Sequence, residues 1–192
     1  MTILVGYASV HSATEGIARE MGDRLRKGGI DASVRPLNEV RDVSSYKGFV
    51  IGSAIHDQEW LPSAQSFLER FVVELSRYPV WLFSVCAVGD TASFFGPKLS
   101  ALIRRARRDD AIVARTTKSI TPLAHRHFAG ALRKGDWSRA GELFLKLCGG
   151  VVGDHRDWQD VDAWADEIAR TLHTRNQAKG RERLHLMVRG KP

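Results

Sequence analysis

The sequence is poor in cysteine and contains no long hydrophobic run, and each absence excludes a class of protein. Cys86 and Cys148 are the two cysteines among 192 residues, and they form neither a CxxC pair nor a disulfide-rich pattern. A reducing cytoplasm is therefore the simplest compartment, with each thiol interpreted as a buried apolar group. No apolar run approaches the roughly 20 residues of a membrane span. The N-terminus leads directly into a strand, so we also expect no signal peptide.

The sequence also lacks the two common glycine-rich phosphate motifs. Its first apolar run, residues 3–8, precedes a loop without the glycine spacing of a dinucleotide-binding loop or the lysine of a Walker loop. Hydroxyl side chains stand there instead, at Ser9, Ser12 and Thr14. A strand, a tight loop and a helix start bring free backbone N–H groups and the positive end of the helix dipole to one point. The pattern predicts a phosphate site of the kind that holds a flavin monophosphate.

Acidic residues are fewer than basic ones, and the excess positive charge is unevenly placed. The chain carries a net charge of +7, with a net +8 in residues 98–134 and a net +5 in residues 174–192, so the remainder is mildly acidic. Such a basic segment suits an anionic membrane, an acidic partner or nucleic acid. A solvated face of a helix over residues 98–108 explains the charge equally well. No recognised nucleic-acid motif accompanies it, so we rank nucleic-acid binding low.

Strands and amphipathic helices alternate along the chain, which predicts a doubly wound parallel sheet in a single three-layer α/β domain. Strands are expected at residues 3–8, 32–37, 48–53, 80–85 and 127–132, and residues 111–120 are a short strand or an irregular excursion. Helices are expected at residues 14–27, 61–75, 97–108, 137–147 and 161–172. The domain is expected to cover residues 1–173, followed by a flexible basic tail over 174–192.

Three loops are expected at the carboxyl ends of strands, where a doubly wound sheet binds its ligand. The first is the hydroxyl-rich loop described above. The second carries Trp60, a candidate stacking partner for a planar ring. The third is rich in small residues and contains Gly89, where backbone can approach a ring edge closely. Three such loops in the correct order predict a single site for a planar, phosphorylated ligand.

Each residue of these loops also has a purely structural interpretation. Thr14 is a suitable N-cap for the helix that follows it. Trp60 can hold the start of the next helix on the sheet. His56 suits an exposed loop as well as a proton donor, and Asp90 can cap a turn.

Four segments make the sequence resemble the flavodoxin-like proteins. They are residues 7–14, residues 52–55 with 60–62, residues 83–85, and a C-terminal part that contains residues 128–132, 157–158 and 164–165. The C-terminal part resembles the branch that contains the flavodoxin-type, menaquinone-dependent protoporphyrinogen oxidases. This resemblance extends to about His173 and implies a flavodoxin fold, an FMN site and two-electron redox chemistry.

The resemblance also implies which residues surround FMN, while the flavin itself performs the redox step. It places Ser9, Ser12, Ala13 and Thr14 at the phosphate, Ser53, Ala54, Ile55 and Trp60 on one side of the ring, and Ser84, Val85, Cys86, Gly89 and Asp90 on the other. The first loop departs from the family at Ser12 and Ala13, where a glycine and a hydroxyl residue are usual. Relatives often place a tyrosine and a glycine near His56 and Gln58, and Gln58 resists a positive φ that glycine allows.

Our leading hypothesis is an FMN-dependent oxidoreductase that passes electrons between an organic donor and a quinone-like acceptor. Porphyrinogen is the substrate that the resemblance suggests, and the basic segment 98–134 would dock on an anionic membrane. A flavodoxin-type electron carrier is the alternative, although such carriers tend to be strongly acidic and this chain has a pI near 9.8. A flavodoxin fold without FMN, acting as an interaction module, is a third hypothesis motivated by the unusual loops 10–13 and 56–58.

Overall fold

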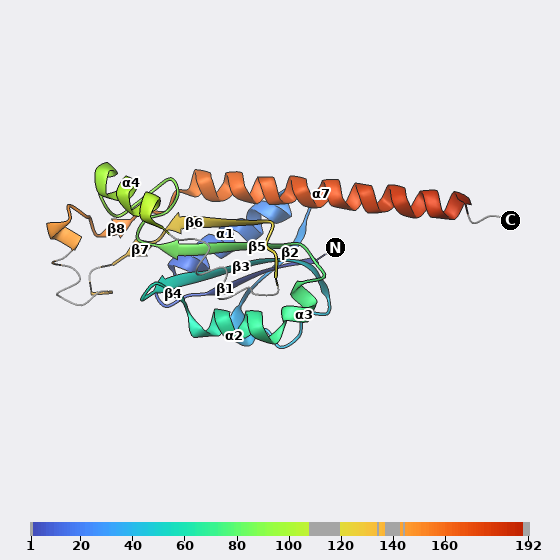
Figure 1. Ribbon diagram of the computed structural model, residues 1–192, viewed down its shortest axis with the longest axis horizontal. Helices are drawn as coiled ribbons and strands as arrows, with labels where there is room; N and C mark the ends of the chain where they lie inside the picture. The colour runs from blue at the N-terminus through green and yellow to red at the C-terminus, as the bar shows by residue number, and fades with distance from the viewer. Residues whose placement is uncertain (1, 108–119, 134, 137–142, 144, 190–192) are drawn as a thin grey trace.

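A computed structural model describes residues 2–107, 120–133, 135–136, 143 and 145–189 of the chain (Figure 1). The strands are β1 Thr2–Ala8, β2 Asp31–Pro36, β3 Tyr46–His56, β4 Glu59–Trp60, β5 Val80–Cys86, β6 Ala124–Ala129, β7 Ala131–Leu132 and β8 Gly153–Asp154. The helices are α1 Ala13–Lys27, the 3-10 turn η1 Leu37–Glu39, α2 Pro62–Arg70, α3 Val72–Leu75, α4 Pro97–Ala106 and α7 Trp158–Arg189.

The central sheet has the strand order β2-β1-β3-β5-β6, and all four of these strand pairs are parallel. The short β4 pairs antiparallel with the end of β3. The direction of winding reverses between β1 and β3, the position outside whose carboxyl ends open α/β sheets bind ligands. The predicted doubly wound α/β fold is therefore confirmed.

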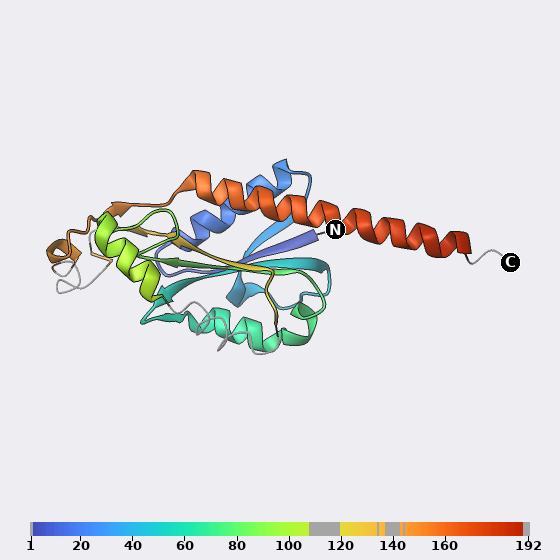
Figure 2. The ribbon, with the colours of Figure 1, turned by 45° about the horizontal axis from the view of Figure 1, so that its top comes forward.

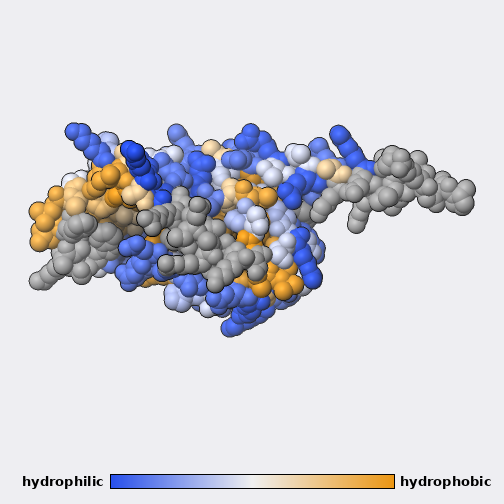
Figure 3. Space-filling view, in the orientation of Figure 1, coloured by the Kyte–Doolittle hydropathy of each residue, from blue (hydrophilic) through white to orange (hydrophobic). Residues whose placement is uncertain are grey.

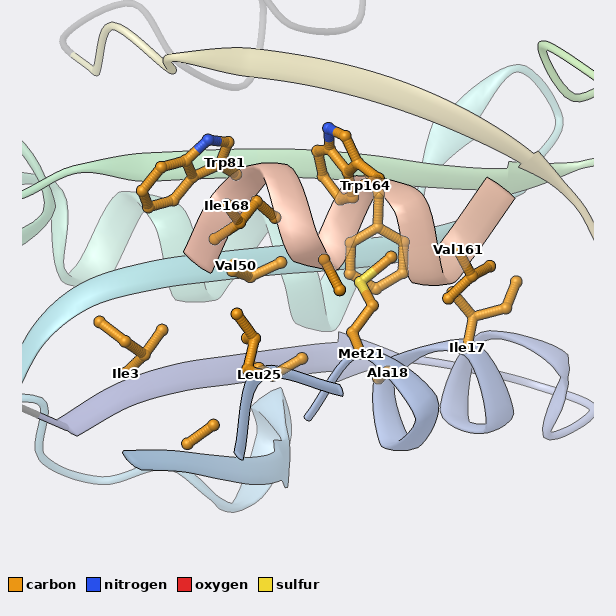
Figure 4. Packing of buried hydrophobic residues seen from close by; sticks show 14 of the residues in the cluster. Ile3, Ile17, Ala18, Met21, Leu25, Val50, Trp81, Val161, Trp164 and Ile168 are labelled. Carbon is orange, nitrogen blue, oxygen red and sulfur yellow. The ribbon is translucent and has the colours of Figure 1, made fainter. Parts of the chain in front are cut away.

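Helices cover both faces of the sheet, because the buried strands are apolar on both sides. In β1, Ile3 and Val5 face one core while Leu4 faces the other. Figure 2 shows α1 and α7 over one face and α2 and α3 over the opposite face. In the first core, Met21 of α1 and Ile168 of α7 pack against the sheet (Figure 4). This packing fixes the start of α1 at the carboxyl end of β1.

The last helix is longer than the sequence led us to expect. We expected a flexible tail from residue 174, whereas α7 continues to Arg189 and extends beyond the sheet (Figure 1). Residues 174–189 contain no proline and a single glycine, so a helix that is already packed over residues 158–172 can propagate through them. Among the described residues, no helix has both the length and the apolar character needed to cross a membrane.

The strand expected at residues 127–132 is also different in the structure. It begins earlier, at Ala124, and ends before Gly130, after which β7 turns away to pair with β8. The sequence pattern did not predict the first half of this strand, because His125 and Arg126 interrupt its apolar run. In the structure His125 bonds to Ser84 and Arg126 pairs with Asp160. The segment 111–119 and most of the helix expected at 137–147 lie outside the described residues.

Candidate functional site

The loop between β1 and α1 has the geometry of an anion cradle. Ser12 precedes the first helical residue with φ at +63°, and its carbonyl accepts the N–H of Gly16 at 3.0 Å. Its side chain makes no capping hydrogen bond. The first N–H groups of a helix have no partner within the helix, so those of α1 are directed to the loop together with the positive end of the dipole. Backbone of this form is suited to a phosphate.

Two buried hydroxyl groups in this cradle have no hydrogen-bond partner among the described residues. Thr14 is only 1% exposed, and neither its Oγ1 nor the buried Oγ of Ser9 is bonded to any described residue. Thr14 is therefore not acting as an N-cap. A buried hydroxyl without a partner costs about 1–3 kcal/mol, so both groups fit a ligand that brings its own acceptors. Ser12 is exposed, and Ala13 packs partly buried against the core.

The loop after β3 is a tight hairpin that Ser53 helps to shape. The Oγ of Ser53 donates to the carbonyl of Ala54 at 2.8 Å and accepts the N–H of Leu61 at 3.0 Å. At the tip, Asp57 and Gln58 have φ values of +49° and +63°. Such values are favoured by glycine and cost an L-residue free energy. Gln58 therefore adopts a positive φ at a position where glycine would avoid the backbone strain. Ala54 and Ile55, both half-buried, lie at the base of the hairpin.

Trp60 lies in the core rather than on the surface of the site. Its side chain is 2% exposed, and the indole Nε1 donates to the Oγ of Ser84 at 2.8 Å. The ring also meets His125 edge-on, with centroids 6.3 Å apart. These contacts correspond to the structural interpretation, in which Trp60 fixes the start of α2 on the sheet. A stacking contact between Trp60 and a flavin stays a prediction.

The loop after β5 is held from two sides, by the backbone of β6 and by helix α4. Asp90 Oδ2 accepts the backbone N–H of His127 at 2.9 Å, and its Oδ1 accepts from Arg107 Nη1 at 2.8 Å. Arg104 Nε donates to the carbonyl of Gly89 at 2.7 Å. A Cβ on Gly89 would overlap the backbone nitrogen of Ala129, so glycine is required for this close approach. The loop expected beside the ring is thus rigidly positioned.

The remaining predicted residues of this loop lie at its base. Val85 is buried and Cys86 is half-buried, with its thiol 3.0 Å from the carbonyl oxygen of Val88. The structure therefore brings the three predicted loops to one edge of the sheet, and the individual contacts of these residues with FMN stay predictions. Sequence reasoning missed Arg104 and Arg107 as loop-binding residues, because it treated the basic segment as a surface.

Two histidines beneath the loop were also missed. His125 and His127 lie on one face of β6 with ring centroids 4.4 Å apart, and His125 Nε2 is 2.9 Å from the Oγ of Ser84. Burial lowers the pKa of His125 to about 4. Burial, reinforced by the neighbouring His125, lowers the pKa of His127 to about 3. Both rings are therefore neutral at pH 7, and the alternation of His at positions i and i+2 was the available signal.

The fold and the cradle together define a class, a doubly wound α/β domain with a mononucleotide phosphate site after its first strand. The chain belongs to the flavodoxin domain family, whose model matches residues 4–139. Membership of this family implies FMN as the cofactor and electron transfer as the chemistry. The two unpartnered hydroxyls of Ser9 and Thr14 fit its phosphate. The family match ends before the motif at residues 157–165, so the protoporphyrinogen oxidase branch is not established.

Several solved structures share this fold. The chain is similar to rubredoxin:oxygen oxidoreductase from Desulfovibrio gigas, with a TM-score of 0.58 and 14% identity over 90% of this chain and 36% of that one. It is similar to a mutant flavodoxin from Pseudomonas aeruginosa, with a TM-score of 0.56 and 13% identity over 90% and 99% of the two chains. Flavodoxin 2 from Bacillus cereus gives a TM-score of 0.55 and 16% identity over 89% and 99%. No protein of curated function matches the sequence.

Proposed function

We propose that the protein is an FMN-dependent oxidoreductase that passes electrons from an organic donor, with a porphyrinogen as the candidate, to a quinone-like acceptor at an anionic membrane surface. The observation that carries this proposal is a group of exposed apolar side chains at the end of the molecule that also holds the cradle. Figure 3 displays apolar surface at the end where α4 and β8 lie.

This exposed group, which we call the apolar tip, consists of Leu102, Leu147 and Val151, whose exposed fractions are 63%, 78% and 60%. Contiguous exposed apolar surface is typical of interaction sites, and Figure 3 shows such surface at this end of the molecule. Lys98 and Arg105 of α4 are exposed nearby. Apolar groups beside basic ones suit an interface that contains anionic lipids and a lipid-soluble acceptor.

The basic segment contributes less surface charge to this tip than its composition suggests. Arg104 and Arg107 bind the loop after β5, and Arg126 pairs with Asp160 of α7. The membrane contact that we propose is therefore centred on the apolar tip and the exposed end of α4. The net charge of the whole chain, +7, argues against an acidic, soluble electron carrier.

In the proposed reaction the chain positions the cofactor. Ser9, Thr14 and the first N–H groups of α1 would hold the phosphate, and the loops after β3 and β5 would flank the ring. When bound, FMN supplies the one- and two-electron chemistry. The hydrogen bonds from Arg104 and Arg107 keep the loop after β5 in place during turnover.

The proposal is tested with the purified full chain in three steps. FMN is titrated into the protein, the complex is reduced anaerobically, and its reoxidation is followed with a menaquinone analogue in anionic vesicles or with a water-soluble acceptor. We expect micromolar or tighter binding and faster reoxidation than free FMN gives. Replacing Leu147 and Val151 by serine should slow only the vesicle reaction. Val73→Ser is the matched control, because Val73 is an exposed apolar residue of α3, away from the tip.

Three results would argue against the proposal. Absence of binding at high FMN concentration would favour the flavodoxin fold that acts without FMN. FMN binding combined with reoxidation no faster than that of free FMN would favour the alternative function, an electron carrier. Turnover of protoporphyrinogen that does not exceed that of free FMN would remove the porphyrinogen as substrate.

A further inference from the structure

A guanidinium group lies against the first turn of α1, beside the cradle. It belongs to Arg156, two residues before α7 begins. Helices α1 and α7 lie side by side and run in the same direction. Gly16, near the start of α1, lies beside Arg156 and Trp158, and Gly28, just after its end, lies beside Ala169. A Cβ on Gly16 would overlap Arg156 Nη1. The absence of a side chain at this position therefore admits the guanidinium to the helix surface.

The guanidinium is oriented by two neighbours. Asp154 accepts from its Nε at 2.8 Å and from its Nη2 at 2.5 Å, which fixes one edge of the planar group. The ring of Trp158 lies against its face, with Cζ 4.4 Å from the ring centroid. Among the described residues, no group accepts a hydrogen bond from the remaining nitrogen, Nη1. The arrangement thus leaves one end of a fixed cation free, on the side of α1.

The start of a helix carries positive charge and repels a cation; Asp154 offsets this repulsion at the Nε and Nη2 edge, and the Nη1 end remains available to a second anion. Gly16 is three residues after Ala13, which corresponds to about 4.5 Å along the helix axis. Independently, the cradle contains the 1% exposed Thr14 and the buried Ser9 hydroxyl, both without partners. A phosphate monoester, with roughly two negative charges and three strong acceptor oxygens, would satisfy all of these groups together.

We propose that Arg156 is a further cofactor-binding residue, whose Nη1 donates to the FMN phosphate held at the start of α1 and makes the chain select phosphorylated flavin. The proposal rests on the proposed FMN-dependent function. It assigns a role to Asp154 and Trp158 as positioning residues, and to Gly16 as the residue that leaves room for the guanidinium.

The experiment compares FMN with riboflavin, which lacks the phosphate, as ligands of the full chain. Dissociation constants are measured by quenching of flavin fluorescence at two salt concentrations. The wild type should prefer FMN, and Arg156→Met should reduce that preference roughly tenfold to 150-fold, the effect of one hydrogen bond to a charged group. Riboflavin affinity should stay unchanged, which also reports that the variant is folded. Arg156→Lys should recover part of the preference.

Two further variants separate this role from a structural one. Arg170→Met removes the same charge from an exposed position of α7, about 20 Å along the helix, and should leave the preference intact. Gly16→Ala keeps the charge but displaces the guanidinium, and should reduce the FMN preference while the helix itself gains stability.

The outcomes are distinguishable. A wild type that binds FMN, with an unchanged FMN-to-riboflavin ratio in Arg156→Met, would overturn the role of Arg156 and leave the proposed function standing. An equal loss for both ligands would assign Arg156 only to the packing of α7 on α1, which also overturns the proposal. A wild type that binds neither flavin would overturn the proposed function and this inference together.

Discussion

The two unpartnered hydroxyls of the cradle allow a prediction in which stability and affinity change in opposite directions. Thr14→Val replaces the hydroxyl by a methyl group of similar size. Oγ1 of Thr14 is buried without a partner among the described residues, which destabilises the apo-protein by about 1–3 kcal/mol, and the valine variant should be free of this cost. Its free energy of unfolding should therefore rise by roughly 1 kcal/mol after the new methyl group is accommodated.

The same substitution should weaken FMN binding. A hydrogen bond from Thr14 to a charged phosphate contributes about 1.5–3 kcal/mol, which corresponds to an increase in Kd of roughly tenfold to 150-fold. Urea denaturation of the apo-protein, followed by tryptophan fluorescence, measures the first effect. Titration with FMN measures the second.

Ser100→Ala provides the matched control for a buried hydroxyl that does have partners. Ser100 is 2% exposed, and its Oγ lies 2.9 Å from the carbonyl oxygens of Phe95 and Gly96. This variant should lose about 1 kcal/mol of stability and bind FMN normally. If Thr14→Val is destabilised as Ser100→Ala is, and its FMN affinity is unchanged, then the hydroxyl of Thr14 is satisfied within the fold and our reasoning about the cradle is refuted.

Three other predictions concern the loops and the histidine pair. Gln58→Gly should raise the urea midpoint by an amount equivalent to about 1 kcal/mol, because φ is +63°, and a lower midpoint would contradict that strain. Gly89→Ala should cost about 1–3 kcal/mol in the same assay through overlap with Ala129, so a neutral effect would contradict the close approach. Burial lowers the pKa of His125 to about 4 and of His127 to about 3 from an ordinary 6.5, so the unfolded state gains protons first as the pH falls. The free energy of unfolding should have its full value above pH 6.5 and decrease as the pH falls from 6.5 to 4. For His125 alone the decrease should reach roughly 3 kcal/mol. An unfolding free energy that does not change over this range would contradict the burial of neutral histidines.

Much of the fold was predictable because its signals are local. The apolar run at residues 3–8, the hydroxyl-rich loop and the helix pattern after it each reflect short-range periodicity and backbone chemistry. The strand β6 was only half recognised, since His125 and Arg126 are polar residues whose burial depends on partners on β5 and α7. No local pattern contains that information.

The candidate site divides in the same way. The sequence identified the loops, but it left two uses open for Trp60, and the indole hydrogen bond to Ser84 became visible only once β3, β4 and β5 were assembled. For Asp90 the sequence left open a ligand-loop residue and a turn cap; the structure shows that it ties the loop to β6 and to Arg107, and its contact with FMN stays a prediction.

By itself, the sequence determined the class of fold and predicted the edge of the sheet and the hydroxyl-rich loop where a phosphorylated ligand is expected to bind. These features follow from residues that are neighbours along the chain. Only the tertiary structure decided which charges meet at that edge. It places Arg156 against Gly16, 140 positions earlier in the sequence, and it directs Arg104 and Arg107 to the loop after β5. Such contacts depend on the docking of α7 on α1 and of α4 on the loop, and packing of this kind leaves no period in the sequence.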